Sequence, residues 1–308
     1  MPVISINNFT IIGFGNQAKA WALNLKDSGF DVYIGLREDS KSHDKAKSLG
    51  LKTFTLDKEP IPTLNFALLT PDETHQDVLS VLSNINADKN CIYAHGFSIT
   101  SRKLHLFHPN FNHYLMAPKA IASELRFRFQ TKDNLTAFYS LEFGDANFFE
   151  TLEAIAFGLG INNLYPTTFE EETKADLFSE QSILCSLLPY GINEAFNTLV
   201  NRGYSKELAF FECFYESKLI IDTLFKLGPD EFFKVISPNA LLGSEVGKLK
   251  LFDDAFREKL SELLDDIERH RFNQLISSTD IDQTRKQVSK YWKSQELEDT
   301  YSNLKARL

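Results

Sequence analysis

The sequence predicts an α/β protein: a doubly wound, mostly parallel sheet at the N-terminus, followed by an all-α domain. Short apolar runs alternate with helical periods through the first half of the chain, which is typical of parallel strands joined by crossover helices. A glycine-rich turn follows the first apolar run. Beyond about residue 165 the strand signal fades and long amphipathic stretches dominate. We therefore expect two domains, at 1–165 and 166–308.

Six short apolar segments are predicted to be buried strands of the sheet. They span residues 9–15, 31–36, 65–70, 90–96, 113–119 and 135–141. Helical periods between them predict helices over 16–28, 40–49 and 72–84. In the second half, amphipathic stretches predict helices over 167–187, 191–202, 205–227 and 251–275.

Composition excludes several classes of protein. The chain of 308 residues is 43% hydrophobic and 24% charged, with a formal net charge of −9. It has no basic stripe of the kind that binds nucleic acid and no apolar run long enough to span a membrane. The first residues do not resemble a secretory signal, so we expect a cytoplasmic protein. Cys91, Cys185 and Cys213 are far apart and are predicted to be buried thiols of a reducing compartment.

The first predicted strand ends in a phosphate-binding loop. "IIGFGNQA" reads as a strand, then Gly13-x-Gly15-x-x-Ala18, then a helix. Glycine permits a tight turn and lets the backbone approach a diphosphate, whose charge the helix N-terminus stabilises. Because the motif lies between a strand and a helix, it predicts a Rossmann-like dinucleotide site.

The end of the second strand, "GLREDSKS", bears on the choice of cofactor. Enzymes that use NAD usually place an acidic residue here to bind the ribose hydroxyls. This chain offers Arg37, Ser40 and Ser42, which suit a 2′-phosphate because guanidinium binds phosphate oxygens bidentately. Glu38 and Asp39 point the other way. On balance the loop favours NADP(H).

Two acidic pairs lie on predicted helices with apolar flanks. Asp176 and Glu180 are four residues apart, as are Glu212 and Glu216, so each pair shares one helix face. Burial of ionised carboxylates without compensation is costly, and a divalent cation would relieve it. Oxygen ligands favour Mg²⁺ or Mn²⁺. The alternative is that each pair lies on a solvated helix face.

Several segments together resemble ketol-acid reductoisomerase (acetohydroxyacid isomeroreductase) in its short, class I form. They run in family order from "IIGFGNQAKAWALNLKDSGFDVYIGLREDSKS" through "LLTPDE", "AHGFSI" and "MAPK" to "TTFEEETKADLFSEQSILC" and "RGYSKELAFFECFYESKLIIDTLF". "DLFSEQ" and "FECFYESKLI" are the most specific, since the family typically has "DLFGEQ" and "FECLHELKLI".

The resemblance implies a role for each matching residue. Asp176, Glu180, Glu212 and Glu216 would bind two Mg²⁺ ions. His95, Lys119 and Glu216 would take part in catalysis, and Ser237 would contact the substrate. The residues implied in NADP(H) binding are Gly13, Phe14, Gly15, Asn16, Gln17, Arg37, Ser40 and Ser42.

The resemblance also implies the reaction and the assembly. The family moves an alkyl group within 2-acetolactate or 2-aceto-2-hydroxybutyrate and then reduces the new ketone with NADPH, in valine and isoleucine biosynthesis. Its helical domain is knotted. In the short form the second acidic pair and the serine come from the neighbouring subunit, which implies a homodimer or a higher homo-oligomer.

Two segments depart from the family pattern. After Lys119 the family usually has a Gly-Pro-Gly-His turn, where this chain has "AIASEL". After Ser237 the family usually reads "SNTAEYG", where this chain has "SPNALLG". Two alternatives to the family activity therefore stay open. One is a divergent NADPH-dependent reductase or isomerase acting on another small keto-hydroxy acid, and the other is a weakly active or non-catalytic NADPH-binding paralogue.

Overall fold

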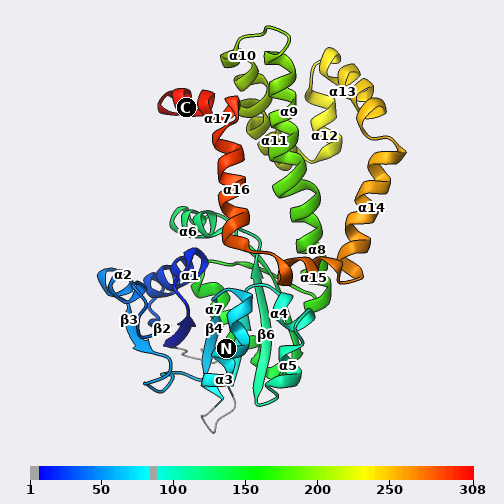
Figure 1. The fold of residues 1–308 in the computed structure, drawn as a ribbon. Helices are drawn as coiled ribbons and strands as arrows, with labels where there is room; N and C mark the ends of the chain where they lie inside the picture. Colours follow the sequence, from blue (N-terminus) through cyan, green and yellow to red (C-terminus); the bar gives the residue numbers. More distant parts are fainter. Residues whose placement is uncertain (1–6, 84–88) are drawn as a thin grey trace. The chain divides into compact units, whose positions relative to one another are not determined.

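A computed structural model describes residues 7–83 and 89–308 (Figure 1). The chain forms two compact units, at 1–173 and 174–308, which we call the Rossmann-like unit and the helical unit. In the described part, no helix is long and apolar enough to cross a membrane.

The described residues of the Rossmann-like unit form one eight-stranded sheet with the order β3-β2-β1-β4-β5-β6-β7-β8. All neighbouring strands are parallel except β6 and β7, which confirms the predicted doubly wound architecture. The strands are β1 (Asn8–Ile12), β2 (Asp31–Leu36), β3 (Lys52–Thr55), β4 (Asn65–Leu68), β5 (Lys89–Tyr93), β6 (Phe111–Pro118), β7 (Thr136–Phe143) and β8 (Asn163–Pro166).

The sequence did not predict β3 and β8, which form the two edges of the sheet. Each has only four residues, of which β3 buries one and β8 none. An edge strand packs on fewer neighbours than a central strand, so it lacks the continuous apolar run that marks the other six.

Helices cover both faces of this sheet. One face packs on α1 (Asn16–Asp27), α6 (Ala122–Thr131) and α7 (Phe149–Gly158) through a core that includes Trp21, Leu125 and Ile155. The other face packs on α3 (His75–Leu82), α4 (Phe97–Thr100) and α5 (Leu104–Phe107). The described part of this unit also contains α2 (Ser42–Ser48) and the short 3₁₀ helices η1 (Asp72–Thr74) and η2 (Ala146–Phe148). Residue 84, the last of the predicted helix 72–84, lies outside the described residues.

The helical unit confirms the predicted all-α second part. Helix α8 (Phe169–Ser179) continues into the π-helical segment η3 (Glu180–Leu187) and then α9 (Leu188–Val200). Its other elements are α10 (Lys206–Phe210), the π-helical η4 (Phe211–Tyr215), α11 (Glu216–Leu227), α12 (Pro229–Val235), α13 (Pro238–Leu251), α14 (Asp254–Glu268), α15 (Arg271–Ser278), α16 (Ile281–Lys293), α17 (Glu296–Leu304) and η5 (Lys305–Arg307). The single helix predicted over 251–275 is wrong, because His270 adopts a left-handed conformation with φ 58° and ends α14.

The helical unit buries few large apolar side chains. Its core cluster consists of Phe196, Ala209, Phe210 and Leu297. The expectation of three buried cysteines holds only for Cys91, because Cys185 is exposed on η3 and Cys213 is partly buried on η4. All three are free thiols.

Candidate functional site

The glycine loop connects β1 to α1 in the geometry of a dinucleotide site. Gly13 has φ 99°, and its N–H donates to the carbonyl of Gly35 at 3.0 Å. A side chain at Gly13 would lie 2.8 Å from the carbonyl oxygen of Leu69. Only glycine fits this position, since the loop requires both a left-handed conformation and a close approach to the segment after β4.

Gly15 is the N-cap of α1 and leaves the first turn of that helix open. It makes no side-chain cap, and nothing lies within 4 Å of where its Cβ would be. Asn16 is exposed, whereas Phe14 and Gln17 are partly buried. The first-turn amides of this 12-residue helix therefore have no side-chain cap at the loop, as a diphosphate site requires.

The loop after β2 presents one arginine and two serines. Arg37 is exposed, and Ser40 and Ser42 are partly buried. The Ser40 hydroxyl accepts from the Ser42 amide at 3.3 Å, which shapes the turn into α2. Glu38 forms an ion pair with Lys58 at 2.5 Å. Because Lys58 offsets the acid beside it, the charge of this loop is less opposed to a phosphate than the sequence suggested.

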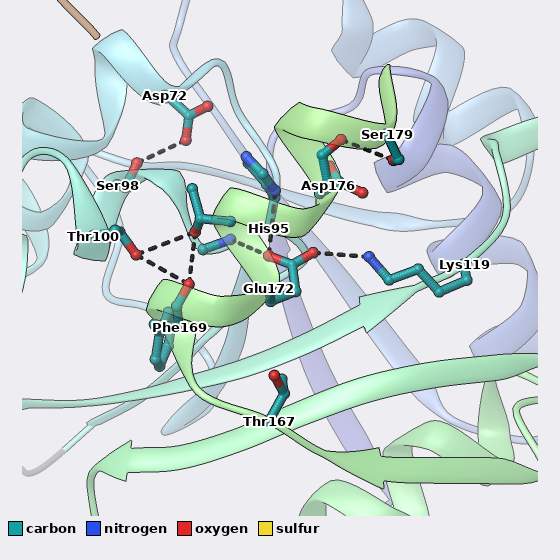
Figure 2. A network of polar contacts seen from close by, with 12 residues as sticks. Asp72, His95, Ser98, Thr100, Lys119, Thr167, Phe169, Glu172, Asp176 and Ser179 are labelled. Carbon is teal, nitrogen blue, oxygen red and sulfur yellow. Dashed lines mark hydrogen bonds and ion pairs between the residues drawn. The ribbon is translucent and has the colours of Figure 1, made fainter. Parts of the chain in front are cut away.

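The predicted catalytic residues His95 and Lys119 meet at a carboxylate that the sequence analysis missed. Glu172, at the start of α8, accepts from Lys119 Nζ at 3.0 Å, and its other oxygen lies 3.4 Å from His95 Nδ1 (Figure 2). The Glu172 side chain is 2% exposed, against 29% for His95 and 33% for Lys119. We call these three residues the Glu172 cluster. His95 follows β5 and Lys119 follows β6, so the cluster lies where two parallel strands end, the usual place of a ligand site in such a sheet.

Electrostatics keep Glu172 ionised despite its burial. Burial alone would raise the pKa of this carboxyl group, but hydrogen bonding and charge from His95 and the charge of Lys119 outweigh it, and the pKa of Glu172 lies below its usual value. The buried anion is therefore paired with polar groups that remain partly accessible. Lys119 and His95 can face a ligand while Glu172 holds them.

The first turn of α8 is fixed to the residues after β5. The Gly96 amide donates to Glu172 at 3.0 Å, and Thr100 Oγ1 donates to the Phe169 carbonyl at 3.0 Å. A side chain at Gly96 would lie 2.4 Å from Thr173 Oγ1 and 2.6 Å from the Phe169 carbonyl oxygen. This close approach explains why Glu172 reaches the cluster. Its spacing in the sequence offered one signal, since it lies four residues before Asp176 and shares its helix face.

The two acidic pairs lie in helical segments of unusual form. Asp176 is partly buried on α8, one turn beyond Glu172 (Figure 2), and Glu180 begins the π-helical η3. Glu212 lies in the π-helical η4, and Glu216 begins α11. π-Helical turns are rare and frequently mark functional sites.

The structure of one chain does not bring the two acidic pairs together. Glu180, Glu212 and Glu216 are exposed. Within residues 7–83 and 89–308, no three of the four carboxylates form a group with the spacing of metal ligands. In a single chain the Glu212/Glu216 pair is therefore exposed to solvent and is not part of such a group.

Ser237 lies at the N-terminus of α13. Its hydroxyl accepts from the Ala240 amide at 3.2 Å, and Pro238 occupies the first turn. This is a regular N-cap, and the residue is exposed. The hydroxyl thus has a structural role in addition to the substrate contact that the resemblance implies.

Two sequence models of one family match the chain in succession. Residues 3–163 match the NADPH-binding domain of acetohydroxy acid isomeroreductase. Residues 169–308 match the C-terminal domain of ketol-acid reductoisomerase.

Solved structures agree with this match. The chain is similar to an NADH-preferring ketol-acid reductoisomerase from an uncultured archaeon, with 25% identity and a TM-score of 0.88 over 100% of this chain and 96% of the other. It shares its fold with a semialdehyde dehydrogenase NAD-binding protein from Cupriavidus necator, at 18% identity and a TM-score of 0.63 over 85% and 99% of the two chains. The chain also shares its fold with pyrroline carboxylate reductase of Plasmodium falciparum, at 12% identity and a TM-score of 0.57 over 84% and 94% of the two chains. The chain belongs to the family of ketol-acid reductoisomerases, NAD(P)-dependent enzymes that join an isomerase step to an oxidoreductase step.

Proposed function

We propose that the protein catalyses the full reductoisomerase reaction on 2-acetolactate and 2-aceto-2-hydroxybutyrate, with Mg²⁺ and NADPH, and yields 2,3-dihydroxy-3-methyl acids. The observation that carries this proposal is the Glu172 cluster. In a chain of this family it joins a lysine and a histidine through a buried carboxylate. It lies at the C-terminal ends of β5 and β6, and His95 shares a cavity with Gln17 of the phosphate loop. Glu172 lies in the first turn of α8, which carries Asp176 and continues into η3, where Glu180 lies.

The donor set fits Mg²⁺. All four proposed ligands, Asp176, Glu180, Glu212 and Glu216, are carboxylates, the hard oxygen ligands that this ion selects. When bound, Mg²⁺ would supply Lewis acidity toward the hydroxyl and carbonyl oxygens of the substrate. Cytoplasmic location is a further expectation, in keeping with a biosynthetic role.

The remaining chemistry is assigned to side chains of the protein. Glu216 is proposed to accept the substrate hydroxyl proton as the alkyl group migrates to the neighbouring carbonyl carbon. Lys119, paired with Glu172, would balance negative charge on substrate oxygen. His95, which follows β5, would help to orient the substrate. When bound, the nicotinamide would supply the hydride that reduces the new ketone, with a proton taken up at its oxygen.

NADPH is the proposed cofactor because of the loop after β2. Arg37 offers an exposed guanidinium, and the neighbouring Glu38 is held by Lys58. The archaeal relative is described as NADH-preferring, so the preference has to be measured for this chain. The ratio of NADPH to NADH affinity is the test.

A homodimer is proposed because α11 and α13, on either side of α12, contain no buried residue. Their apolar side chains are exposed, and Phe225 is 91% exposed. Amphipathic helices gain most of their stability from packing, and exposed apolar surface of this extent marks an interface. A second copy of the chain would cover it and would supply Glu212, Glu216 and Ser237 to its partner's site.

A divergent reductase on another keto-hydroxy acid is the second candidate, favoured by the segment after Lys119. Ile121 is 72% exposed and lines a groove of about 460 Å³ with Asn16 and Lys19. An apolar side chain there changes the surroundings of the phosphate loop.

The test is consumption of NADPH by the purified protein with 2-acetolactate and Mg²⁺, with the dihydroxy acid identified as product. Turnover that needs both Mg²⁺ and 2-acetolactate supports the proposal. Turnover only with other keto-hydroxy acids supports the second candidate. NADPH binding without turnover of any of them indicates a non-catalytic paralogue and overturns both.

A further inference from the structure

A buried chain of polar groups connects the segments after β4 and β5 beside the phosphate loop. Ser98 Oγ lies 2.7 Å from Asp72 Oδ1 and 2.7 Å from His75 Nδ1 (Figure 2 shows the first contact). His75 Nε2 lies 2.9 Å from the Thr70 carbonyl oxygen. Ser98 is fully buried, and the side chain of Asp72 is 36% exposed. The chain thus runs from an accessible carboxylate to a backbone carbonyl.

The number of protons shared by Asp72, Ser98 and His75 decides how many of these three contacts are hydrogen bonds. The Thr70 carbonyl only accepts, so His75 Nε2 must carry a hydrogen. In a neutral His75 the other nitrogen, Nδ1, then has none and must accept from the Ser98 hydroxyl. The Ser98 and Asp72 oxygens would then face each other at 2.7 Å with no hydrogen between them. Three hydrogen bonds require one more proton, either on His75 or on Asp72.

The same residues form part of a cavity beside the glycine loop. Its volume is about 180 Å³, and its lining comes from α1, the ends of β4 and β5, and the residues that follow them: Gln17, Leu68, Leu69, Thr70, Asp72, His75, Tyr93, Ala94 and His95. Leu69 and Thr70 also pack on Gly13, where a side chain would be too close. Thr70, whose carbonyl is the partner of His75, therefore also contacts the phosphate loop.

We propose that Asp72, Ser98 and His75 form a proton-dependent clasp that sets dinucleotide affinity. With the extra proton, all three contacts are hydrogen bonds, and Asp72 is held against Ser98. The three side chains together then carry no net charge. Without it, the Asp72 carboxylate turns from Ser98 toward the cavity as an unbalanced anion. An anionic dinucleotide then binds less tightly, and by reciprocity its binding favours uptake of one proton.

The charged groups around His75 define the range of this effect. Burial lowers the pKa of His75, and Arg102 lowers it further, whereas Asp72, the Thr70 carbonyl and Glu73 raise it, and the pKa lies below its usual value of 6.5. Tyr93 packs against the imidazole from β5 at 5.8 Å between ring centres. The clasp therefore changes state on the acid side of neutrality when the cofactor is absent.

Asp72→Asn provides a sharp test because an amide completes the chain without the extra proton. Its N–H donates to Ser98, whose hydroxyl donates to His75 Nδ1, while Nε2–H still donates to Thr70. The dissociation constants of NADPH and NADH are measured from pH 5 to 8 for the unmutated protein, Asp72→Asn and Ser98→Ala. NADH is the control, because the 2′-phosphate of NADPH itself titrates with a pKa of about 6.

For the unmutated protein we expect NADH affinity to increase about tenfold from the alkaline to the acid side, equivalent to one pKa unit of coupling. Asp72→Asn should bind NADH tightly at every pH, with no such dependence. Ser98→Ala should also lose the dependence but bind weakly throughout. An unchanged pH profile in Asp72→Asn would overturn the proposal.

Nitrogen NMR of histidine-labelled, cofactor-free protein gives an independent readout. Above the transition, His75 should carry its hydrogen on Nε2 alone, and addition of NADH should move its titration toward higher pH. A titration that cofactor leaves unmoved contradicts the clasp. Neither measurement needs turnover, so the clasp can fail while the reductoisomerase proposal stands, and the reverse.

Discussion

The two units of the chain hold their polar groups in different ways. In the Rossmann-like unit, Glu172 is buried and is bonded by Lys119 and the Gly96 amide, so the cluster is fixed by its own unit. In the helical unit, Glu212 and Glu216 are exposed on a surface with exposed apolar neighbours. The polar groups of the first unit are already organised, whereas the proposed metal ligands of the second are exposed and, under our proposal, need a partner subunit. Substitution of Glu172 should therefore lower both stability and turnover, whereas substitution of Glu216 should lower turnover and the stabilisation by Mg²⁺.

The largest effect is expected in the helical unit, from Glu216→Gln. Loss of a metal ligand removes several kcal/mol of transition-state stabilisation, which corresponds to a fall in kcat of roughly a thousandfold or more. NADPH affinity should stay nearly unchanged. Glu268→Gln, an exposed acid at the end of α14, is the matched control.

The same pair of variants tests the metal by thermal unfolding. Mg²⁺ should raise the melting temperature of the unmutated protein and of the control by binding the native state, and should do so much less for Glu216→Gln. If Mg²⁺ stabilises all three proteins equally, the carboxylates are a solvated face and hold no metal.

Glu172→Gln should have the next largest effect, and it should lower stability as well as turnover. Displacement of Lys119 and His95 by about 1 Å corresponds to roughly a hundredfold loss of kcat. Loss of a buried charge beside Lys119 costs up to about 3 kcal/mol, reduced by the partial exposure of Lys119. Glu171→Gln, exposed on the same helix, should leave kcat and unfolding free energy within twofold and about 0.5 kcal/mol of the original values.

Glu172 should also shape the response to acid. Because its pKa is lowered in the fold, its ionised form stabilises the protein at neutral pH, and this contribution is lost as the pH falls below about 4.3. Unfolding free energy measured from pH 3 to 7 should therefore fall less steeply in Glu172→Gln. An identical acid slope in both proteins would show that Glu172 is not held as the structure indicates.

A smaller and selective effect is expected from Arg37→Asp. A charge-assisted bond to phosphate is worth about 1.5–3 kcal/mol, so the NADPH dissociation constant should increase about 10- to 100-fold, while that of NADH changes little. Fluorescence titration with both cofactors measures the ratio. Equal losses, or an original preference for NADH, would remove Arg37 from the 2′-phosphate site.

Short sequence patterns predicted the features that are determined by residues adjacent in sequence. The glycine loop, the six inner strands, and the positions of His95 and Lys119 at strand ends follow from short motifs and apolar runs. Glu172 was missed because its role depends on a contact with Gly96, 76 residues away. The clasp was missed for the same reason, since Asp72 and Ser98 meet only when two strand-end segments pack together. Edge strands β3 and β8 lack the apolar run that marks a strand buried on both faces.

The smallest effect concerns assembly. Burial of one phenylalanine contributes about 1.5–3 kcal/mol, so Phe225→Ser should weaken the dimer by at least about tenfold. Phe157→Ser, equally apolar and 79% exposed in the Rossmann-like unit, is the control and should leave assembly unchanged. Sedimentation over a range of protein concentrations measures both. Equal behaviour of the two variants would place the interface elsewhere.

The central claim is that the helical unit of one subunit completes the site of another. Asp176→Ala and Glu216→Ala proteins are refolded together, with each variant alone as the control. Each alone should be inactive, because both of its sites lack a ligand. A heterodimer would keep one site with all four carboxylates, so a random mixture should recover about a quarter of the original activity. No recovery in a mixture shown to contain heterodimers would contradict the account and place all four ligands in one chain.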